Sequence, residues 1–137
     1  MEPDTQNAEP QQPTSDSQLP RGFLKGIELF NQGEYFEAHE VWEELWMECP
    51  AAERRFIQAL IQAAVAVYHL SRGNLTGATR LFHSGRRYME PYRPTYLRLD
   101  VAHFWQQMEA HLAPALTGGA TGPRPVIVLV PPPAGPT

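Results

Sequence analysis

The chain has 137 residues, 42% of them hydrophobic, and a formal net charge of −4, which suits one soluble globular domain with its own core. No apolar stretch approaches the roughly 20 residues of a membrane-spanning helix, and the first residues lack the basic start and apolar run of a signal peptide. The acidic balance disfavours nucleic acid as a partner, so we expect a cytoplasmic protein that binds neither membranes nor nucleic acid.

Residues 1–19 are rich in Pro, Gln, Ser, Thr and acidic side chains. They carry too few apolar groups to offset the entropy lost on ordering. We predict a disordered amino-terminal tail there, followed by a helical domain over residues 20–113.

Apolar spacing predicts three helices in the first half of this domain. Phe23, Leu24, Ile27 and Phe30 recur at three and four residues and predict a helix over 21–31. The next two helices are predicted over about 34–48 and about 51–72. The helix over 51–72 is the most apolar segment of the chain, so we expect it to be central.

Two more helices follow from capping residues and prolines. Asn74 is a suitable amino-terminal cap for a fourth helix, whose apolar stripe ends near Met89. Asp100 caps a fifth helix that we expect to end before Pro114. The predicted fold is an all-α, compact bundle of about five antiparallel helices built from helical hairpins, with disordered tails at both ends.

Residues 114–137 form a Gly/Pro-rich tail that contains one short apolar run, at 126–130. The run either lacks fixed structure, docks on the bundle or enters a partner's groove. Of these, we favour a tail without fixed structure, because prolines flank the run on both sides.

Two stretches, at 29–45 and 70–86, resemble each other. Each has a helix end, a glycine near the turn and a small residue early in the next helix. The likeness to tetratricopeptide repeats is partial, because the Trp and Pro landmarks are missing and the two stretches are separated by more than the roughly 34 residues of that repeat. Helical hairpins are therefore expected, and a repeat solenoid is not.

Charges are segregated along the domain. Residues 34–48 contain six glutamates and no base, whereas residues 72–98 contain six arginines and one glutamate. We interpret the arginines as complements of the acidic helix and of helix ends rather than as a phosphate-binding surface.

The single cysteine, Cys49, excludes an internal disulfide and agrees with a reducing compartment. A catalytic role for it is disfavoured because no histidine is close to it in the sequence.

The sequence HEVWE at 39–43 is the most distinctive motif. His39 and Glu43 are four residues apart and share a helix face. A zinc protease helix would need histidine at position 43, and a di-iron bundle would need glutamate at position 36, where Phe36 stands. Neither strong metal motif is present.

A polar pocket around His39 is a weaker hypothesis. If the second and third helices pair antiparallel, His39 comes level with about residue 60, between Gln58 and Gln62, while His69 lies at the other end of the groove. Such a cluster could bind a polar ligand or, through His39 and Glu43, a metal; equally, its members could only satisfy one another. The candidate pocket residues are Glu37, His39, Glu40, Glu43, Gln58, Gln62 and His69.

Three blocks of the sequence together resemble a known family. They are FNQGEYFEAHEVWEELW at 30–46, FIQALIQAAVAVYH at 56–69 and RGNLTGATRLF at 72–82. In this order they are similar to the domain of unknown function 309 family of bacteria and archaea, over about 21–90. The sequence has Ala59 where that family commonly has glycine.

The resemblance implies a small all-α cytoplasmic domain whose biochemical activity is not established, and it supplies no reaction and no cofactor. The family's characteristic polar positions correspond here to Glu37, His39, Glu40, Glu43, Gln58, Gln62, His69 and Asn74.

Two functions are compatible with these residues. The first is a non-enzymatic module that binds a protein partner or itself, as a homo-oligomer, with Trp42 and Trp46 as interface candidates, because interfaces favour aromatic side chains. The alternative is a small-ligand or metal-binding protein, or a hydrolase, that uses His39, Glu43, Gln58 and Gln62.

Overall fold

The computed structural model describes residues 19–132 and contains all five predicted helices. The all-α fold class is confirmed. Of the predicted amino-terminal tail, residues 1–18 lie outside the described residues, and Leu19 is buried in the core. The elements are α1 (Arg21–Asn31), α2 (Tyr35–Glu48), α3 (Ala51–Ser71), α4 (Leu75–Met89), a short 3-10 helix η3 (Glu90–Tyr92), β1 (Thr95–Tyr96), β2 (Leu99–Asp100) and α5 (Val101–Leu116).

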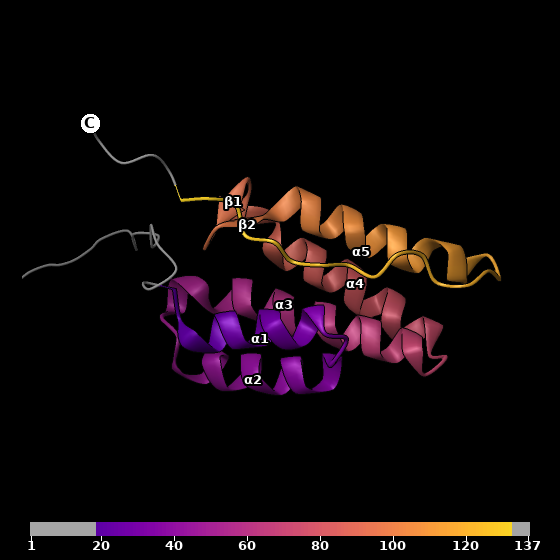
Figure 1. The fold of residues 1–137 in the computed structure, drawn as a ribbon, viewed down its shortest axis with the longest axis horizontal. Coiled ribbons are helices and arrows are strands. Elements are labelled where there is room, and N and C mark those ends of the chain that lie inside the picture. The colour runs from indigo at the N-terminus through magenta and orange to yellow at the C-terminus, as the bar shows by residue number, and fades with distance from the viewer. Residues whose placement is uncertain (1–18, 133–137) are drawn as a thin grey trace, which may run out of the picture.

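Helix α3 is central, as its composition predicts. It packs against α2 on one side and α4 on the other, and α5 lies beyond α4 (Figure 1). Nine of its residues are buried, four of them alanines, and these small side chains let neighbouring helices approach closely. At Ala59 the backbone carbonyl lies 3.2 Å from where a Cβ on Gly85 of α4 would stand. The close helix contact is therefore made with the glycine on α4.

Both predicted side-chain caps are present. Asn74 accepts a hydrogen bond from the Gly77 N–H at 2.9 Å, and Asp100 accepts one from the His103 N–H at 3.1 Å. Each cap satisfies a donor that the first helical turn leaves without a partner. The local sequence thus determines where α4 and α5 begin.

A β-hairpin of two short strands, β1 and β2, precedes α5, and the sequence does not predict it. Its turn residues, Leu97 and Arg98, have φ angles of 46° and 64°, which the favoured two-residue hairpin turn requires and which glycine and asparagine normally supply. Leu97 is fully buried. Because its side chain is an anchor in the core, tertiary packing stabilises a turn that the local sequence does not indicate.

The predicted end of the fifth helix before Pro114 is wrong, since α5 continues to Leu116 with Pro114 inside it. Proline lacks the N–H that would bond to the carbonyl four residues earlier, which here belongs to Ala110. Only one bond is lost so close to the helix end, so the helix tolerates it.

The preferred prediction for the carboxyl-terminal tail is also wrong over residues 117–132. Residues 117–121 reverse the chain direction, and residues 122–130, which we call the strap, run back along α5 (Figure 1). Pro125 and Ile127 are buried. Docking on the bundle, the alternative that the sequence left open, is what the structure shows; residues 133–137 lie outside the described residues.

Candidate functional site

A small hollow opens between α2 and α3 and contains the histidine of the HEVWE motif. Its volume is about 170 Å³. The walls are mainly aromatic: the Phe36 and Tyr68 rings lie 5.5 Å apart, and the Phe36 and His39 rings 4.9 Å apart. Its lining residues, which define the α2–α3 hollow, are Tyr35, Phe36, His39, Val65, Tyr68 and His69.

His39 is held in place by its own helix. Its Nδ1 lies 2.6 Å from the Phe36 carbonyl oxygen, and because a carbonyl oxygen can only accept, Nδ1 carries the hydrogen. Its Nε2 lies 3.6 Å from a carboxylate oxygen of Glu43. The predicted pairing of His39 with Glu43 on one face is therefore present, at a distance longer than a hydrogen bond.

The structure does not assemble the four-residue polar cluster. Val65, Tyr68 and His69 face His39 in the hollow, and neither Gln58 nor Gln62 lines it. Side chains lean toward the amino-terminal end of each helix. In an antiparallel pair, the His39 side chain therefore leans away from the α2–α3 turn, whereas the side chains of α3 lean toward it. As a result, His39 faces residues that come later in α3 than the number of residues from the turn predicts.

Gln62 is directed elsewhere. Its Cβ lies 3.3 Å from where a Cβ on Gly85 of α4 would stand, so it packs between α3 and α4. Its Oε1 atom is buried without a hydrogen-bond partner among the described residues. Any role for Gln58 and Gln62 in binding stays a prediction.

Tyr35 is one of the residues that line the hollow. Burial raises the pKa of Tyr35, and the nearby Arg124 guanidinium partly offsets this by lowering it. Its hydroxyl is buried without a hydrogen-bond partner in residues 19–132. Tyr35 therefore stays a neutral, largely apolar wall at neutral pH.

The outer face of α2 is acidic and lies next to the hollow. Glu37, Glu40 and Glu43 are exposed, as are Glu44 and Glu48 on the following turns. Within the described residues none of these carboxylates forms an ion pair with Lys or Arg. The face is consequently rich in carboxylates and poor in basic side chains.

The two tryptophans of α2 differ in position. Trp42 is fully buried, and its indole N–H donates to the Phe23 carbonyl at 3.3 Å. The expectation that Trp42 lies at an exposed interface is therefore wrong: it is a core residue. Trp46 is half-buried, and the Arg54 guanidinium covers its ring at 4.2 Å from the centroid; its role at an interface stays a prediction.

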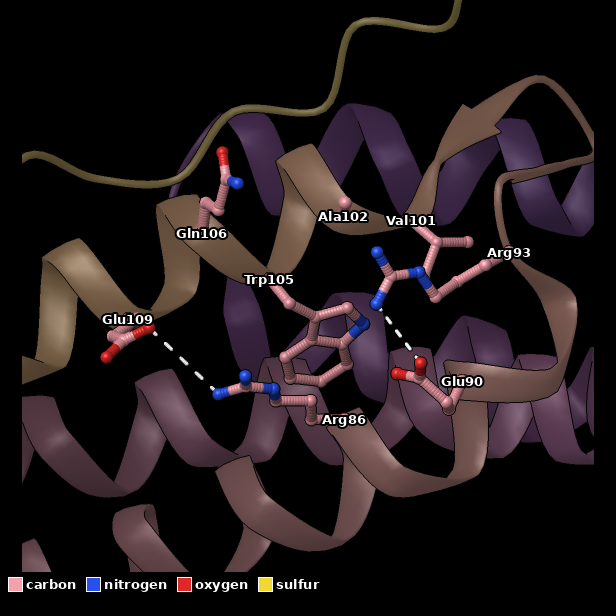
Figure 2. Close-up of a pocket in the computed structure, with 8 residues that line it drawn as sticks. All are labelled: Arg86, Glu90, Arg93, Val101, Ala102, Trp105, Gln106 and Glu109. Carbon is pink, nitrogen blue, oxygen red and sulfur yellow. Dashed lines mark hydrogen bonds and ion pairs between the residues drawn. The ribbon is translucent and has the colours of Figure 1, made fainter.

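A second hollow, of about 220 Å³, lies between α4 and α5. Figure 2 shows Trp105 between two ion pairs there: Arg93 with Glu90 at 3.1 Å, and Arg86 with Glu109 at 4.0 Å. Both arginines that line this hollow, Arg86 and Arg93, therefore have a carboxylate partner. The interpretation of the arginines as complements of acidic groups fits this hollow, although the acids belong to η3 and α5 rather than to α2.

Across residues 19–132, no three His, Cys, Asp or Glu side chains come close enough together to hold a metal ion. No helix in this same part of the chain is long and apolar enough to cross a membrane.

Sequence reasoning did not identify Tyr35, Phe36, Val65 and Tyr68 as site residues. They resemble ordinary core positions in an amphipathic helix, and only the pairing of α2 with α3 shows that they surround a hollow. The spacing of Phe36, three positions before His39 and so on the same helix face, was the one available signal in the sequence.

Comparison with known proteins shows a likeness to one family over part of the chain. Residues 23–81 match the family described as Domain of unknown function (DUF309). The Uncharacterized protein YpuF of Bacillus subtilis (strain 168) is 42% identical over 65 residues, which are 47% of this chain and 37% of the relative. The chain thus spans well under two thirds of that relative's length. Residues 23–81, which include the whole α2–α3 hollow, are therefore similar to the DUF309 family.

Proposed function

We propose that the helical domain is a non-enzymatic protein-interaction module, and that the α2–α3 hollow receives one apolar side chain of a protein partner. The observation that carries this proposal is the aromatic wall of the hollow. Phe36 is 45% exposed although its ring packs against His39 and Tyr68. Large apolar side chains that remain accessible beside a concave surface are typical of binding sites.

The size of the hollow favours a side chain over a free cofactor. Small-molecule pockets usually have volumes of roughly 300–1,000 Å³, whereas this hollow has about 170 Å³. One buried aliphatic or aromatic side chain contributes roughly 1.5–3 kcal/mol of binding free energy, which suits an anchor residue within a larger interface.

The negative charge of α2 favours basic residues next to that anchor in the partner. Glu37, Glu40 and Glu43 lie next to the hollow without Lys or Arg partners among the described residues. A partner segment with Lys or Arg beside its apolar anchor would complement this face and associate faster at low salt.

Selection of displayed peptides on the immobilised full chain tests the proposal. We expect enriched peptides to share one large apolar residue with basic neighbours. Val65→Trp, which fills the hollow, should reduce their affinity at least tenfold. Thr76→Trp adds the same side chain at an exposed site on α4 and should leave the affinity unchanged.

The proposal fails if the enriched peptides show no common apolar residue. It fails equally if they bind the Val65→Trp variant as well as the unmodified chain, with circular dichroism showing that both are folded.

A second candidate function rests on a different observation. His39 and His69 both line the hollow, and imidazoles are versatile ligands and proton carriers. A small molecule or a metal bound through His39, with Glu43 as its neighbour, would make this a ligand-binding protein or a hydrolase. The small volume and the absence of Gln58 and Gln62 from the lining weigh against this alternative.

We further propose that the protein works in the prokaryotic cytoplasm and associates with itself. Its single cysteine, Cys49, suits a reducing compartment, and the relative that it matches is bacterial. Size-exclusion chromatography with light scattering tests the self-association, and cell fractionation tests the location.

A further inference from the structure

Two amide side chains bind the backbone of the strap. Asn31 accepts from the Ile127 N–H at 2.8 Å and donates to the Ile127 carbonyl at 2.9 Å. Gln107 does the same for Val126, with both distances 2.9 Å. Each amide therefore binds both polar groups of one residue, much as a neighbouring β-strand would.

A third pair of hydrogen bonds holds the far end of the strap. The Val130 N–H donates to the Arg98 carbonyl at 2.8 Å, and the Arg98 Nε–H donates to the Val130 carbonyl at 2.7 Å. At the near end, the His111 Nδ1 lies 3.0 Å from the Gly122 carbonyl oxygen. In all these hydrogen bonds the strap takes part through its backbone N–H and carbonyl groups, so they require an extended strap backbone rather than particular strap side chains.

Strap side chains alternate between buried and exposed. Pro125 and Ile127 are buried, whereas Val126 and Val128 are 41% and 78% exposed. A two-residue period is typical of an extended segment lying on a surface. The strap thus lies on the bundle as an extended apolar peptide, with Pro125 and Ile127 as its two buried anchors.

The connection to α5 makes the strap separable from the bundle. Residues 117–121 are exposed and include Gly118 and Gly119. Residues 122–130 belong to no helix or strand, so release of the strap would break no secondary structure.

We propose that the groove formed by Asn31, Arg98 and Gln107 is a binding site for extended peptides, and that the strap of a second copy of this chain can occupy it in place of the chain's own strap. A second copy carries the sequence whose fit to the groove is visible here. The reciprocal exchange of two identical straps closes a symmetric dimer. This inference does not depend on the α2–α3 hollow, which has different lining residues.

Competition within one chain determines when exchange occurs. A short flexible connection gives the chain's own strap an effective concentration on the order of 1 mM. Exchange should therefore become visible when the own strap cannot compete.

Complementation between two full-length variants removes that competition. In the groove variant, Asn31→Asp and Gln107→Glu keep the side-chain shapes but replace donors to the Ile127 and Val126 carbonyls by charged acceptors, so its intact strap is released. In the strap variant, Ile127→Asp places a charge at a buried anchor, so its intact groove is empty. Mixed at about 1 mM each, the two should form a 1:1 complex of about twice the chain mass of 15.4 kDa.

Matched controls isolate the effect. Each variant alone should keep the mass of the unmodified chain, because one lacks a groove and the other lacks a strap. Val128→Asp changes an exposed strap residue and, in place of Ile127→Asp, should give no complex, since the strap then still fills its own groove. The proposal is overturned if folded groove and strap variants do not associate when mixed.

A shortened connection provides a second test if either variant fails to fold. Deletion of residues 118–121 joins Thr117 directly to Gly122, whose N–H donates to the His111 carbonyl. His111 lies six helical residues before Thr117, which is about 9 Å. After the deletion, Gly122 must lie about 3.8 Å from Thr117, the distance between adjacent Cα atoms. Gly122 therefore cannot reach His111, and the strap can no longer return to its own groove. We expect this variant to be a dimer that Ile127→Asp converts to a monomer; a folded monomer, or a dimer insensitive to Ile127→Asp, would overturn the proposal.

Discussion

The turn between α1 and α2 and the turn between α3 and α4 are nearly identical in backbone geometry. Gly33 and Gly73 have φ angles of 85° and 80°. The next residue returns an N–H to a carbonyl five positions earlier: Glu34 to Leu29 at 2.9 Å in the first turn, and Asn74 to His69 at 2.8 Å in the second. A glycine at the positive φ that ends a helix is a local requirement of the chain, so the predicted helical hairpins are confirmed at both places.

What surrounds the two turns is different. A Cβ on Gly33 would lie 2.6 Å from the Arg124 guanidinium of the strap region, whereas a Cβ on Gly73 would have no neighbour within 4 Å. Asn74 caps α4 with its side chain, whereas Glu34 makes no side-chain cap. The same local structure is therefore stabilised by a distant segment in the first hairpin and by its own cap in the second.

The first hairpin also depends on one close contact, which gives the largest expected effect. A Cβ on Gly26 would collide with the Trp42 indole, and Trp42 is fully buried. We expect Gly26→Ala to lower the free energy of unfolding by about 3 kcal/mol, because the core has no room for the ring to move. Guanidinium unfolding followed by circular dichroism measures it.

Gly22→Ala is the matched control in the same helix. Its Cβ would lie at an ordinary 3.4 Å from the Leu45 Cβ, and alanine favours helix by up to about 1 kcal/mol over glycine. Equal losses for Gly22→Ala and Gly26→Ala would contradict the assigned role of the Gly26–Trp42 contact.

Alanine at the two turn glycines sharpens the comparison directly. Positive φ costs a side-chain-bearing residue roughly 1–2 kcal/mol, so Gly33→Ala and Gly73→Ala should both destabilise the protein. Gly33→Ala should cost more, by about 0.5 kcal/mol, because it also displaces Arg124, which donates to the Asn31 carbonyl at 3.2 Å.

A double-mutant cycle checks the origin of that difference. In an Arg124→Ala background the two glycine substitutions should have equal effects on the free energy of unfolding. If the difference persists there, the strap does not stabilise the first turn through Arg124.

The caps provide a smaller contrast. Asn74→Ala removes the acceptor of the Gly77 N–H and should cost about 1 kcal/mol. Glu34→Ala removes no cap and should change stability by less than about 0.5 kcal/mol. Similar costs for the two substitutions in urea unfolding would refute the assignment of a cap to the second hairpin alone.

The smallest effect concerns pH and Glu53, at the start of α3. Burial raises the pKa of Glu53 above its ordinary value of 4.5. The folded state therefore holds this proton more tightly than the unfolded state, so the stabilisation is complete below the ordinary pKa and is lost as pH rises through the raised pKa. Glu53→Gln should accordingly lose less stability than the unmodified chain between about pH 4 and pH 7; identical pH profiles would contradict the shift.

Local chemistry explains which parts of this fold could be predicted. Apolar spacing gave α1 its observed bounds, 21–31, and Asn74 and Asp100 cap as expected. The turn at Leu97 and the strap could not be predicted, because a buried side chain and distant amides hold them. The predicted polar pocket differs from the observed hollow for a related reason. The sequence places His39 on one face of its helix, but which residues of α3 face His39 depends on how α2 and α3 pack together.

The central claim is that the α2–α3 hollow receives a protein side chain rather than a free small molecule or metal. Native mass spectrometry of the full chain, purified without a tag or chelator, tests it most directly. We predict masses that correspond to the polypeptide alone, as monomer or oligomer. A retained metal or small molecule that is lost in His39→Ala, and kept in the matched surface variant His83→Ala, would contradict the claim and make the hollow a ligand site.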